Sequence, residues 1–277
     1  MRTGDSMKRI VSALLGFPLV AAILILGNKY VIDVLFSIVA IFCIHEFYKS
    51  FKETAKPVEW VGYVLALSIS FIHIIPKEAL IPIIRLSVPA IILVLFAHVI
   101  ATNMKTNLKD IMITLFGICY IVIFLMFMPY LNGIEANGIE IGKYLVWYIL
   151  FVAWGTDILA YIIGVKFGKH KLTQISPKKS VEGSIAGIIG AVIVSLIYTF
   201  ALNYFMDFNI SYLYITLIAM LLSVIGQIGD LTASSIKRFN NIKDFSNLIP
   251  GHGGMLDRFD SVIFIAPFAY FLLIVLI

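Results

Sequence analysis

The segment from residue 223 to residue 261 gathers charged side chains between two long apolar stretches. It holds four acidic and four basic residues in a chain of which only 13% is charged. Carboxylates bind hard cations such as Mg²⁺, and lysine and arginine neutralise phosphate groups. These residue types therefore predict chemistry on phosphates. They are Asp230, Lys237, Arg238, Lys243, Asp244, Asp257, Arg258 and Asp260.

Asp230 lies near the end of an apolar stretch, where an ionised carboxylate is costly unless water, a cation or a metal compensates it. If a helix continues beyond Asp230, Ser234 follows one turn later and Lys237 about two turns later on the same face. This spacing predicts a carboxylate, a hydroxyl and an ammonium group that act together. The alternative is a charge at a helix end that reaches to the membrane interface.

The stretch Pro250-Gly251-His252-Gly253-Gly254 cannot comfortably continue a helix. Its three glycines let backbone N–H groups approach an anion, although a plain connector would look the same. Asp257 and Asp260 follow three residues apart, a spacing that lets two carboxylates share a hard cation at a helix start. Arg258 beside them can reach a phosphate oxygen.

A second charged cluster precedes these residues in the chain. Asp157 lies about two turns before a basic loop that contains Lys178 and Lys179, and Glu182 and Gly183 follow. Asp157 is either a metal ligand or the structural partner of a cation on a neighbouring helix. The lysines either bind phosphate or only mark the cytoplasmic side of the membrane. Together, the two clusters favour phosphoryl or nucleotidyl transfer, in which catalysis is largely positioning and charge neutralisation.

Hydrophobic residues make up 61% of the 277 residues, and the mean hydropathy is +1.00. Soluble domains are about half apolar. The apolar stretches have the length, about 17 to 25 residues, at which a helix crosses the hydrocarbon core of a bilayer. The sequence therefore predicts an all-α, polytopic integral membrane protein with about nine transmembrane helices. They are expected at roughly 10–27, 31–48, 60–75, 81–101, 109–131, 144–165, 182–204, 211–231 and 259–277.

The distribution of cations predicts a cytoplasmic N-terminus, because cytoplasmic loops are enriched in lysine and arginine. With nine spans, seventeen of the 21 cations fall on that side, and so do both charged clusters. The net charge of +5 is then a topology and headgroup signal, and no nucleic acid partner is expected. Cys43 and Cys119 lie in apolar stretches and predict packing rather than a disulfide or a metal site.

The charged segment resembles the phosphatidate cytidylyltransferase (CDP-diacylglycerol synthase) family. The resemblance rests on Ser234-x-Ile236-Lys237-Arg238, on Lys243-Asp244, and on His252-Gly253-Gly254-x-x-Asp257-Arg258-Phe259-Asp260. It extends back through Gly229-Asp230-Leu231 and residues 157–183, whereas the N-terminal half matches only as a series of spans. Ala233 departs from the pattern, since relatives often carry glutamate there.

The resemblance implies transfer of CMP from CTP to phosphatidate, which yields CDP-diacylglycerol and pyrophosphate. It implies Mg²⁺ as the cofactor, held by Asp230 and Asp257, with Asp260 and Asp157 as further candidates. The predicted catalytic residues are Asp230, Asp257, Lys237, Arg238, Arg258 and Asp260. The predicted substrate-binding residues are Lys178, Lys179, Ser234, His252, Gly253, Gly254 and Asp157.

The resemblance also implies a homodimer. The apolar spans and the distribution of cations predict a multi-pass protein of the inner cell membrane whose active site faces the cytoplasm. Residues 1–100 are then N-terminal transmembrane helices, residues 101–142 a middle helix and loop, and residues 143–277 the catalytic helices with cytoplasmic loops. One alternative is a lipid or polyprenol kinase that uses CTP. The other is an ion-coupled transporter, because charges such as Asp33 and Arg85 inside apolar stretches also mark ion pathways.

Overall fold

The computed structural model describes residues 14, 16, 18–136, 138–251 and 253–276. These residues form helices and loops, with no β-strand among them. Six helical stretches are long and apolar enough to cross a membrane, so the chain is an all-α, multi-pass membrane protein, as predicted. Five of these stretches are α2 (Lys29–Ser50), most of α4 (Lys77–Ala101), α7 (Gly142–Phe167), α8 (Val181–Met206) and α9 (Tyr212–Phe239). The sixth is formed by three consecutive elements, α5 (Leu108–Gly117), η2 (Ile118–Ile123) and α6 (Phe124–Asn132).

The predicted count of about nine spans is not confirmed. Six residues of the expected span 10–27 lie outside the described residues, and residues 18–26 of this span are helical. The expected span 60–75 corresponds to a shorter helical stretch, α3 (Glu59–Ser68) followed by η1 (Ile69–Phe71). The last expected span corresponds to α10 (Leu256–Leu273), whose opening turns carry charged side chains.

The chain divides into two compact units. The first unit comprises the described residues up to Gly133 together with Ile242–Arg258, and the second comprises Ile134–Asn241 and the described residues from Phe259 onward. The boundary therefore falls inside α10. As a result, residues 242–258, which lie between α9 and the body of α10 in the sequence, are packed with the N-terminal helices.

In the first unit, α2 packs against α3, η1, α5, η2 and α6. Phe47 and Tyr48 of α2 are fully buried. The Tyr48 hydroxyl donates to the Thr114 carbonyl at 3.0 Å, and the Thr114 hydroxyl oxygen accepts the Val58 N–H at 2.8 Å. The Tyr48 hydroxyl and the Thr114 hydroxyl are therefore paired although they lie in an apolar core. In contrast, Leu95 is the one buried residue among the described side chains of α4, and the others are partly or fully exposed, as expected for a helix that faces lipid.

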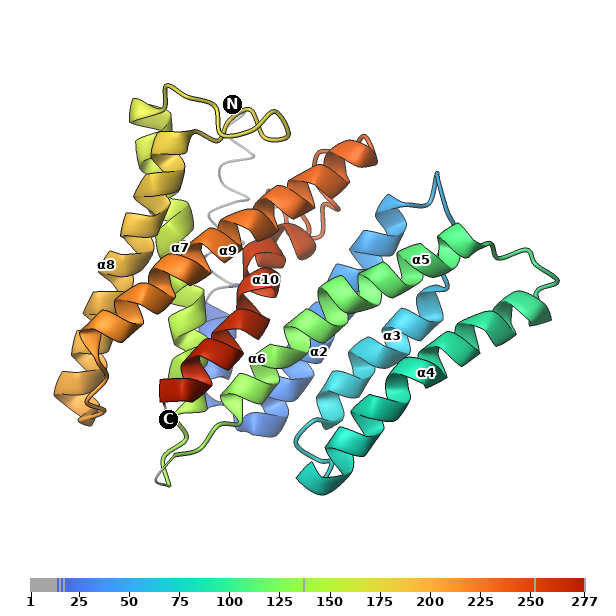
Figure 1. Cartoon of the computed structure of the whole chain (residues 1–277), viewed down its shortest axis with the longest axis horizontal. Helices are drawn as coiled ribbons and strands as arrows, with labels where there is room; N and C mark the ends of the chain where they lie inside the picture. The colour runs from blue at the N-terminus through green and yellow to red at the C-terminus, as the bar shows by residue number, and fades with distance from the viewer. Residues whose placement is uncertain (1–13, 15, 17, 137, 252, 277) are drawn as a thin grey trace. The chain divides into compact units, whose positions relative to one another are not determined.

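In the second unit, α7 and α8 run side by side, and α8 and α7 also pack against α9 (Figure 1). Glycines bring the helices close together. A Cβ atom at Gly155 would lie 3.0 Å from the Gly190 carbonyl oxygen. Small residues at helix interfaces are typical of membrane proteins. The buried Thr156 hydroxyl of α7 donates to the Ser223 hydroxyl of α9 at 2.9 Å and adds a polar link between these two helices.

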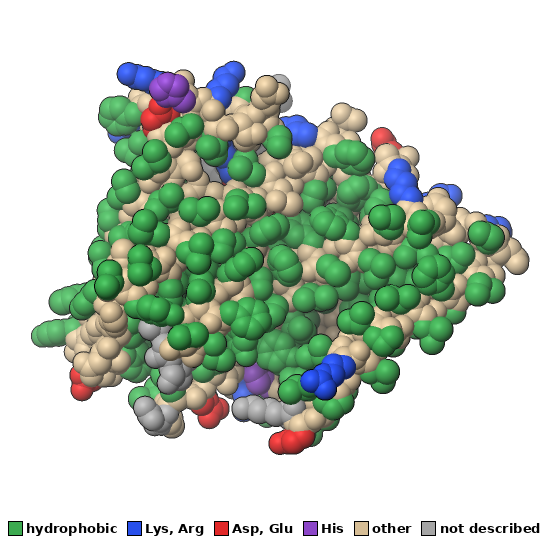
Figure 2. Space-filling view, viewed as in Figure 1, with side chains coloured by type: hydrophobic (Ala, Val, Ile, Leu, Met, Phe, Trp, Pro, Cys, Tyr) green, Lys and Arg blue, Asp and Glu red, His purple; other side chains and the backbone are tan. Residues whose placement is uncertain are grey.

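Hydrophobic side chains cover most of the surface visible in Figure 2, whereas lysine, arginine and acidic side chains are few on this face. Exposed large hydrophobic residues occur along all six of the long apolar stretches. Such a surface suits a lipid environment, in which apolar side chains gain nothing from burial in protein.

Candidate active site

The loop between α7 and α8, which carries the predicted phosphate-binding lysines, is held by pairing across its two sides. The Leu172 N–H donates to the Lys179 carbonyl at 2.9 Å, and the Val181 N–H donates to the His170 carbonyl at 2.9 Å. An isolated bridge between Lys171 and Ser180 lies between these two bonds. The loop therefore has a defined backbone conformation just before α8.

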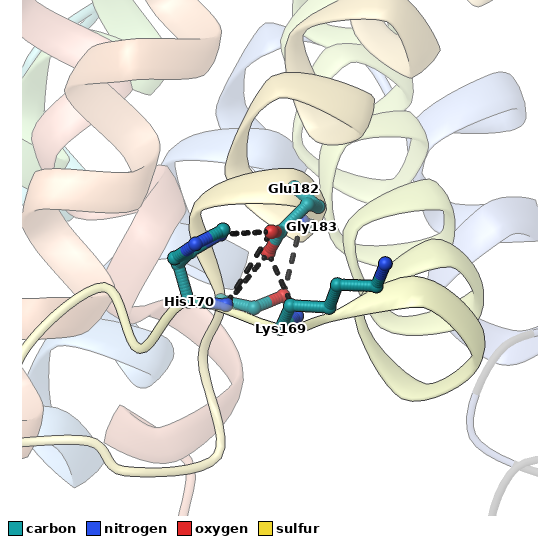
Figure 3. A network of polar contacts seen from close by, with 5 residues as sticks. Lys169, His170, Glu182 and Gly183 are labelled. Carbon is teal, nitrogen blue, oxygen red and sulfur yellow. Dashed lines mark hydrogen bonds and ion pairs between the residues drawn. The ribbon is translucent and has the colours of Figure 1, made fainter.

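Glu182 ties the beginning of this loop to the first turn of α8 (Figure 3). Its carboxylate accepts the backbone N–H of Lys169 at 3.1 Å and of His170 at 3.3 Å, and it also contacts His170 Nδ1 at 2.6 Å. Ser180 caps the same helix, because its hydroxyl oxygen accepts the Gly183 N–H at 3.1 Å. From the sequence, Glu182 was expected next to the site, but no role was predicted for it.

One residue from each of the two charged clusters predicted from the sequence meets the other in the second unit. The ammonium group of Lys179, from the loop, forms an ion pair with the Asp230 carboxylate of α9. Each of the two side chains remains 28% exposed, so the pair lies at an accessible surface. Asp230 therefore has the cationic partner that its position in an apolar helix requires.

A cavity of about 550 Å³ opens beside this ion pair, and the described residues that line it all belong to the second unit. Lys178, Lys179, Asp157 and Asp230 supply its charged groups. Tyr161, Val165 and Leu172 supply apolar wall, and Ser184 and Gln227 supply neutral polar groups. Its volume lies within the range of about 300–1,000 Å³ found for small-molecule sites. A site with both lysines and carboxylates can accept a phosphate-rich ligand together with a cation.

The cavity owes part of its shape to the close packing of α7 and α8. Gly183 and Gly164 both line it, and a Cβ atom at Gly183 would lie 2.8 Å from the Ala160 carbonyl oxygen. A larger residue at Gly183 would therefore push α8 away from α7. The glycine keeps the lysine loop close to Asp157.

Asp260 of α10 provides a third carboxylate, which is buried. It interacts electrostatically with the carboxylates of Asp230 and Asp157 and with the ammonium group of Lys237. Gly229 permits this approach, because a Cβ atom there would lie 2.7 Å from the Asp260 carbonyl oxygen. Three helices thus contribute acids to one region. Among the described residues, however, no three such side chains lie close enough to hold a metal ion by themselves.

The helix that carries Asp230 is longer than the expected span 211–231, since α9 continues to Phe239. Asp230, Ser234 and Lys237 therefore lie on one face of a single helix, as the sequence spacing predicted. Ser234 is buried, whereas Arg238 is exposed. Lys237 and Arg238 lie in the last turn of α9, where cations stabilise a helix.

The glycine-containing loop belongs to the first unit. Gly251 and Gly253 have φ angles of 78° and 84°, which side chains rarely tolerate, so these two glycines shape the turn. Asp257 closes the loop, because its Oδ2 atom accepts the N–H groups of Phe245 at 2.9 Å and Gly254 at 3.0 Å. The N–H group of Gly254, predicted to face an anion, thus binds a carboxylate of the protein itself.

Glu46 of α2 holds the same loop and was missed by the sequence analysis. It is only 2% exposed. Its carboxylate accepts hydrogen bonds from the Ser246 hydroxyl and from the N–H groups of Met255 and Leu256. Glu46 could have been found from the sequence, because it is an acidic residue inside the apolar stretch 31–48. A charged residue within a membrane span is a candidate functional residue.

The predicted site residues thus fall into two sets. The second unit holds Asp157, Lys178, Lys179, Asp230, Ser234, Lys237, Arg238 and Asp260. The first unit holds Gly253, Gly254, Asp257 and Arg258, of which Asp257 is buried and Arg258 exposed. His252 lies outside the described residues.

The sequence as a whole matches the model of the cytidylyltransferase family over residues 7–276. The chain belongs to this family. Three relatives of this chain carry the name phosphatidate cytidylyltransferase. That of Bacillus subtilis is 45% identical over 135 residues, which cover 48% of this chain and about half (49%) of the relative. Those of Staphylococcus saprophyticus and Staphylococcus haemolyticus are 39% and 36% identical, and each alignment covers 68% of both chains. The family resemblance predicted from the motifs is therefore confirmed.

Proposed function

We propose that this cytidylyltransferase transfers CMP from CTP to phosphatidate and produces CDP-diacylglycerol and pyrophosphate. The observation that carries the proposal is the family match over residues 7–276, with three relatives named for this activity. The cavity of the second unit adds a structural reason, because lysines and carboxylates line it together.

In the proposed reaction, a phosphate oxygen of phosphatidate attacks the α-phosphorus of CTP. A new P–O bond forms there while the bond to the oxygen that bridges the α- and β-phosphates breaks, and pyrophosphate leaves with that electron pair. The nucleophile is already anionic, so no strong base is needed. The main difficulty is the repulsion between two anions, which Lys178 and Lys179 are placed to reduce.

The acids of the second unit fit Mg²⁺, because they are the hard oxygen donors that this ion binds. Asp230 is the proposed principal ligand, with Asp157 and Asp260 as further candidates. One or two carboxylates suffice for Mg²⁺ when substrate phosphates complete its coordination. When bound, the ion supplies charge neutralisation for the polyphosphate. The role of Asp257 as the second Mg²⁺ ligand stays a prediction. Its Oδ2 atom already accepts two backbone N–H groups.

We also propose that the N-terminus and the loops after α7 and α9 face the cytoplasm of a bacterial inner membrane. The seventeen-to-four distribution of cations supports this orientation. A homodimer is proposed from the family resemblance. Labelling of single cysteines at exposed loop positions in intact cells and in inverted vesicles would test the orientation, and the mass of the detergent-solubilised protein would test the dimer.

The reaction is tested with the purified protein, phosphatidate and radiolabelled CTP. Label from the α-phosphate should enter the chloroform-soluble product, in equal amount to the pyrophosphate released. Label from the γ-phosphate in the lipid would instead identify a CTP-dependent kinase. Without transfer of either label, the chain would not be an enzyme of this kind, and the transporter alternative would be tested by ion flux in proteoliposomes.

A further inference from the structure

Glu46 joins two segments of the glycine-containing loop that lie on either side of its turn. One oxygen of its carboxylate, Oε1, accepts the Ser246 hydroxyl at 2.5 Å and the Met255 N–H at 2.9 Å. The other oxygen, Oε2, accepts the Leu256 N–H at 2.8 Å. A single side chain from α2 thus holds residues that are 200 to 210 positions away in the sequence.

The position of the carboxylate explains why it is tolerated in the interior of the first unit. Burial of an isolated charge is strongly unfavourable, and three donors together compensate for the lost water. Two of these donors are the N–H groups of Met255 and Leu256 at the beginning of α10, where the helix dipole also favours a negative charge. Glu46 therefore acts as the cap of α10, supplied by another helix.

Gly254 packs directly against the Glu46 carboxylate. A Cβ atom at Gly254 would lie 2.5 Å from Glu46 Oε2, so any larger residue there would displace the Glu46 carboxylate from its three donors. The Gly254 N–H donates to Asp257 Oδ2 in turn. Asp257 and Glu46 thus accept hydrogen bonds from adjacent N–H groups of the same loop, those of Gly254 and Met255. Gly254 lies between the two carboxylates.

The residues fixed in this way border predicted catalytic residues. Leu256 directly precedes Asp257, and Arg258 follows in the same helix. A shift of the Leu256 peptide group would therefore move the Asp257 side chain with it. Misplacement of a catalytic group by about 1 Å can lower a rate by about 100-fold.

We propose that Glu46 is a positioning residue for the reaction, which acts through the N–H groups of Met255 and Leu256 on Asp257 and Arg258. This role rests on the proposed function. It also gives the N-terminal half a specific part in catalysis, although that half matches the family motifs only as a series of spans.

The test compares Glu46→Gln with Asp33→Asn, a matched control. Asp33 is a fully buried carboxylate of the same helix, and it is bonded to the His73 N–H and Nδ1 rather than to the loop. Glu46→Gln keeps the size of the side chain but turns one acceptor into a donor that faces an N–H or hydroxyl group. We expect kcat to fall by about 30- to 100-fold while KM for CTP changes less than about threefold. Asp33→Asn should keep kcat within about threefold of wild type at equal amounts of folded protein.

Hydrogen exchange of the reconstituted protein provides a second readout, since it reports local opening. In Glu46→Gln, the amides of residues 245–256 should exchange faster, and those of α5 should not. Should Glu46→Gln prove impossible to purify, Ser246→Ala removes one of the three hydrogen bonds, and a fall in kcat of about fivefold is expected.

Each contrary result has its own meaning. Wild-type protein that transfers no α-label would overturn the proposed function itself. An active wild type with near-normal kcat in Glu46→Gln, or in Ser246→Ala where that variant is used, would overturn the role of Glu46. An equal loss of kcat in Asp33→Asn would also overturn it, because the effect would then come from general loss of packing.

Discussion

The Lys179 ammonium group pairs with the Asp230 carboxylate and so connects the loop before α8 to α9 at the edge of the cavity. Each partner could exchange this contact for one with a substrate complex, since lysine binds phosphate and a carboxylate binds Mg²⁺. The ion pair therefore keeps both groups in place before the ligands arrive. A partly exposed pair of this kind contributes little to stability, which makes a catalytic role easy to separate from folding.

Substitutions of these two partners should reduce activity without unfolding the protein. We expect Asp230→Asn to abolish turnover, by at least about 100-fold, and Lys179→Met to lower kcat/KM for CTP by about 10- to 100-fold. The double variant should be much less impaired than the product of the two losses, because the residues act as a unit. Lys171→Met is the control: it removes an exposed lysine of the same loop and should stay within about threefold of wild type. Near-full activity of Asp230→Asn would contradict its assignment as a metal ligand.

Removal of divalent cations should stop the reaction, and addition of Mg²⁺ should restore it. Asp260→Asn should raise the Mg²⁺ concentration needed for half-maximal rate by several-fold, since it removes a nearby negative charge that favours cation binding. Asp207→Asn changes an exposed acid at the other end of α8 and should leave this concentration unchanged. Undiminished turnover after complete chelation would mean that the carboxylates serve another purpose.

Glu182→Gln should loosen the loop that presents Lys178 and Lys179. The carboxylate holds two backbone N–H groups and His170 Nδ1, and the amide would keep only one acceptor atom. We expect KM for CTP to rise several-fold with a smaller change in kcat, because ligand binding must then order the loop. Glu53→Gln, at an exposed acid in the turn after α2, provides the comparison. The idea fails if both variants have the KM of the wild type.

Asp257→Asn should also abolish turnover while leaving a folded, membrane-inserted protein. Two causes can be separated in this variant. Loss of a metal ligand would raise the Mg²⁺ requirement, whereas loss of the bonds to the Phe245 and Gly254 N–H groups would speed hydrogen exchange there. Measurement of both quantities assigns the role, and turnover close to that of wild type would exclude both.

The sequence was sufficient to predict the all-α membrane fold, because span length follows directly from bilayer thickness. It was less reliable where helices are short or charged. Glu59–Phe71 is too short to match the expected 60–75, and α10 opens with charged residues. It also ended α9 too early, since hydropathy falls at Asp230 although the helix continues for nine more residues to Phe239.

The two charged clusters were found from the sequence, and the structure joins them through the ion pair of Lys179 with Asp230. The catalytic and binding roles of their residues stay predictions. The partners of the loop could not be predicted in the same way. Glu46 and Leu256 are 210 positions apart, and no local periodicity relates them. The N–H group of Gly254 was expected to approach an anion, but the Asp257 carboxylate accepts it. The contacts of the Met255 and Leu256 N–H groups with Glu46 were not predicted.

The packing of residues 242–258 with the N-terminal helices has a consequence for protein engineering. A chimera that joins the first 133 residues of one homologue to the remainder of another would separate the Glu46 side chain from the loop with which it evolved. Crossovers should therefore transfer residues 242–258 together with the N-terminal helices as a single block. A library of chimeras that ignores this linkage should lose activity most often when the parents differ at the residues around Glu46 and Gly254.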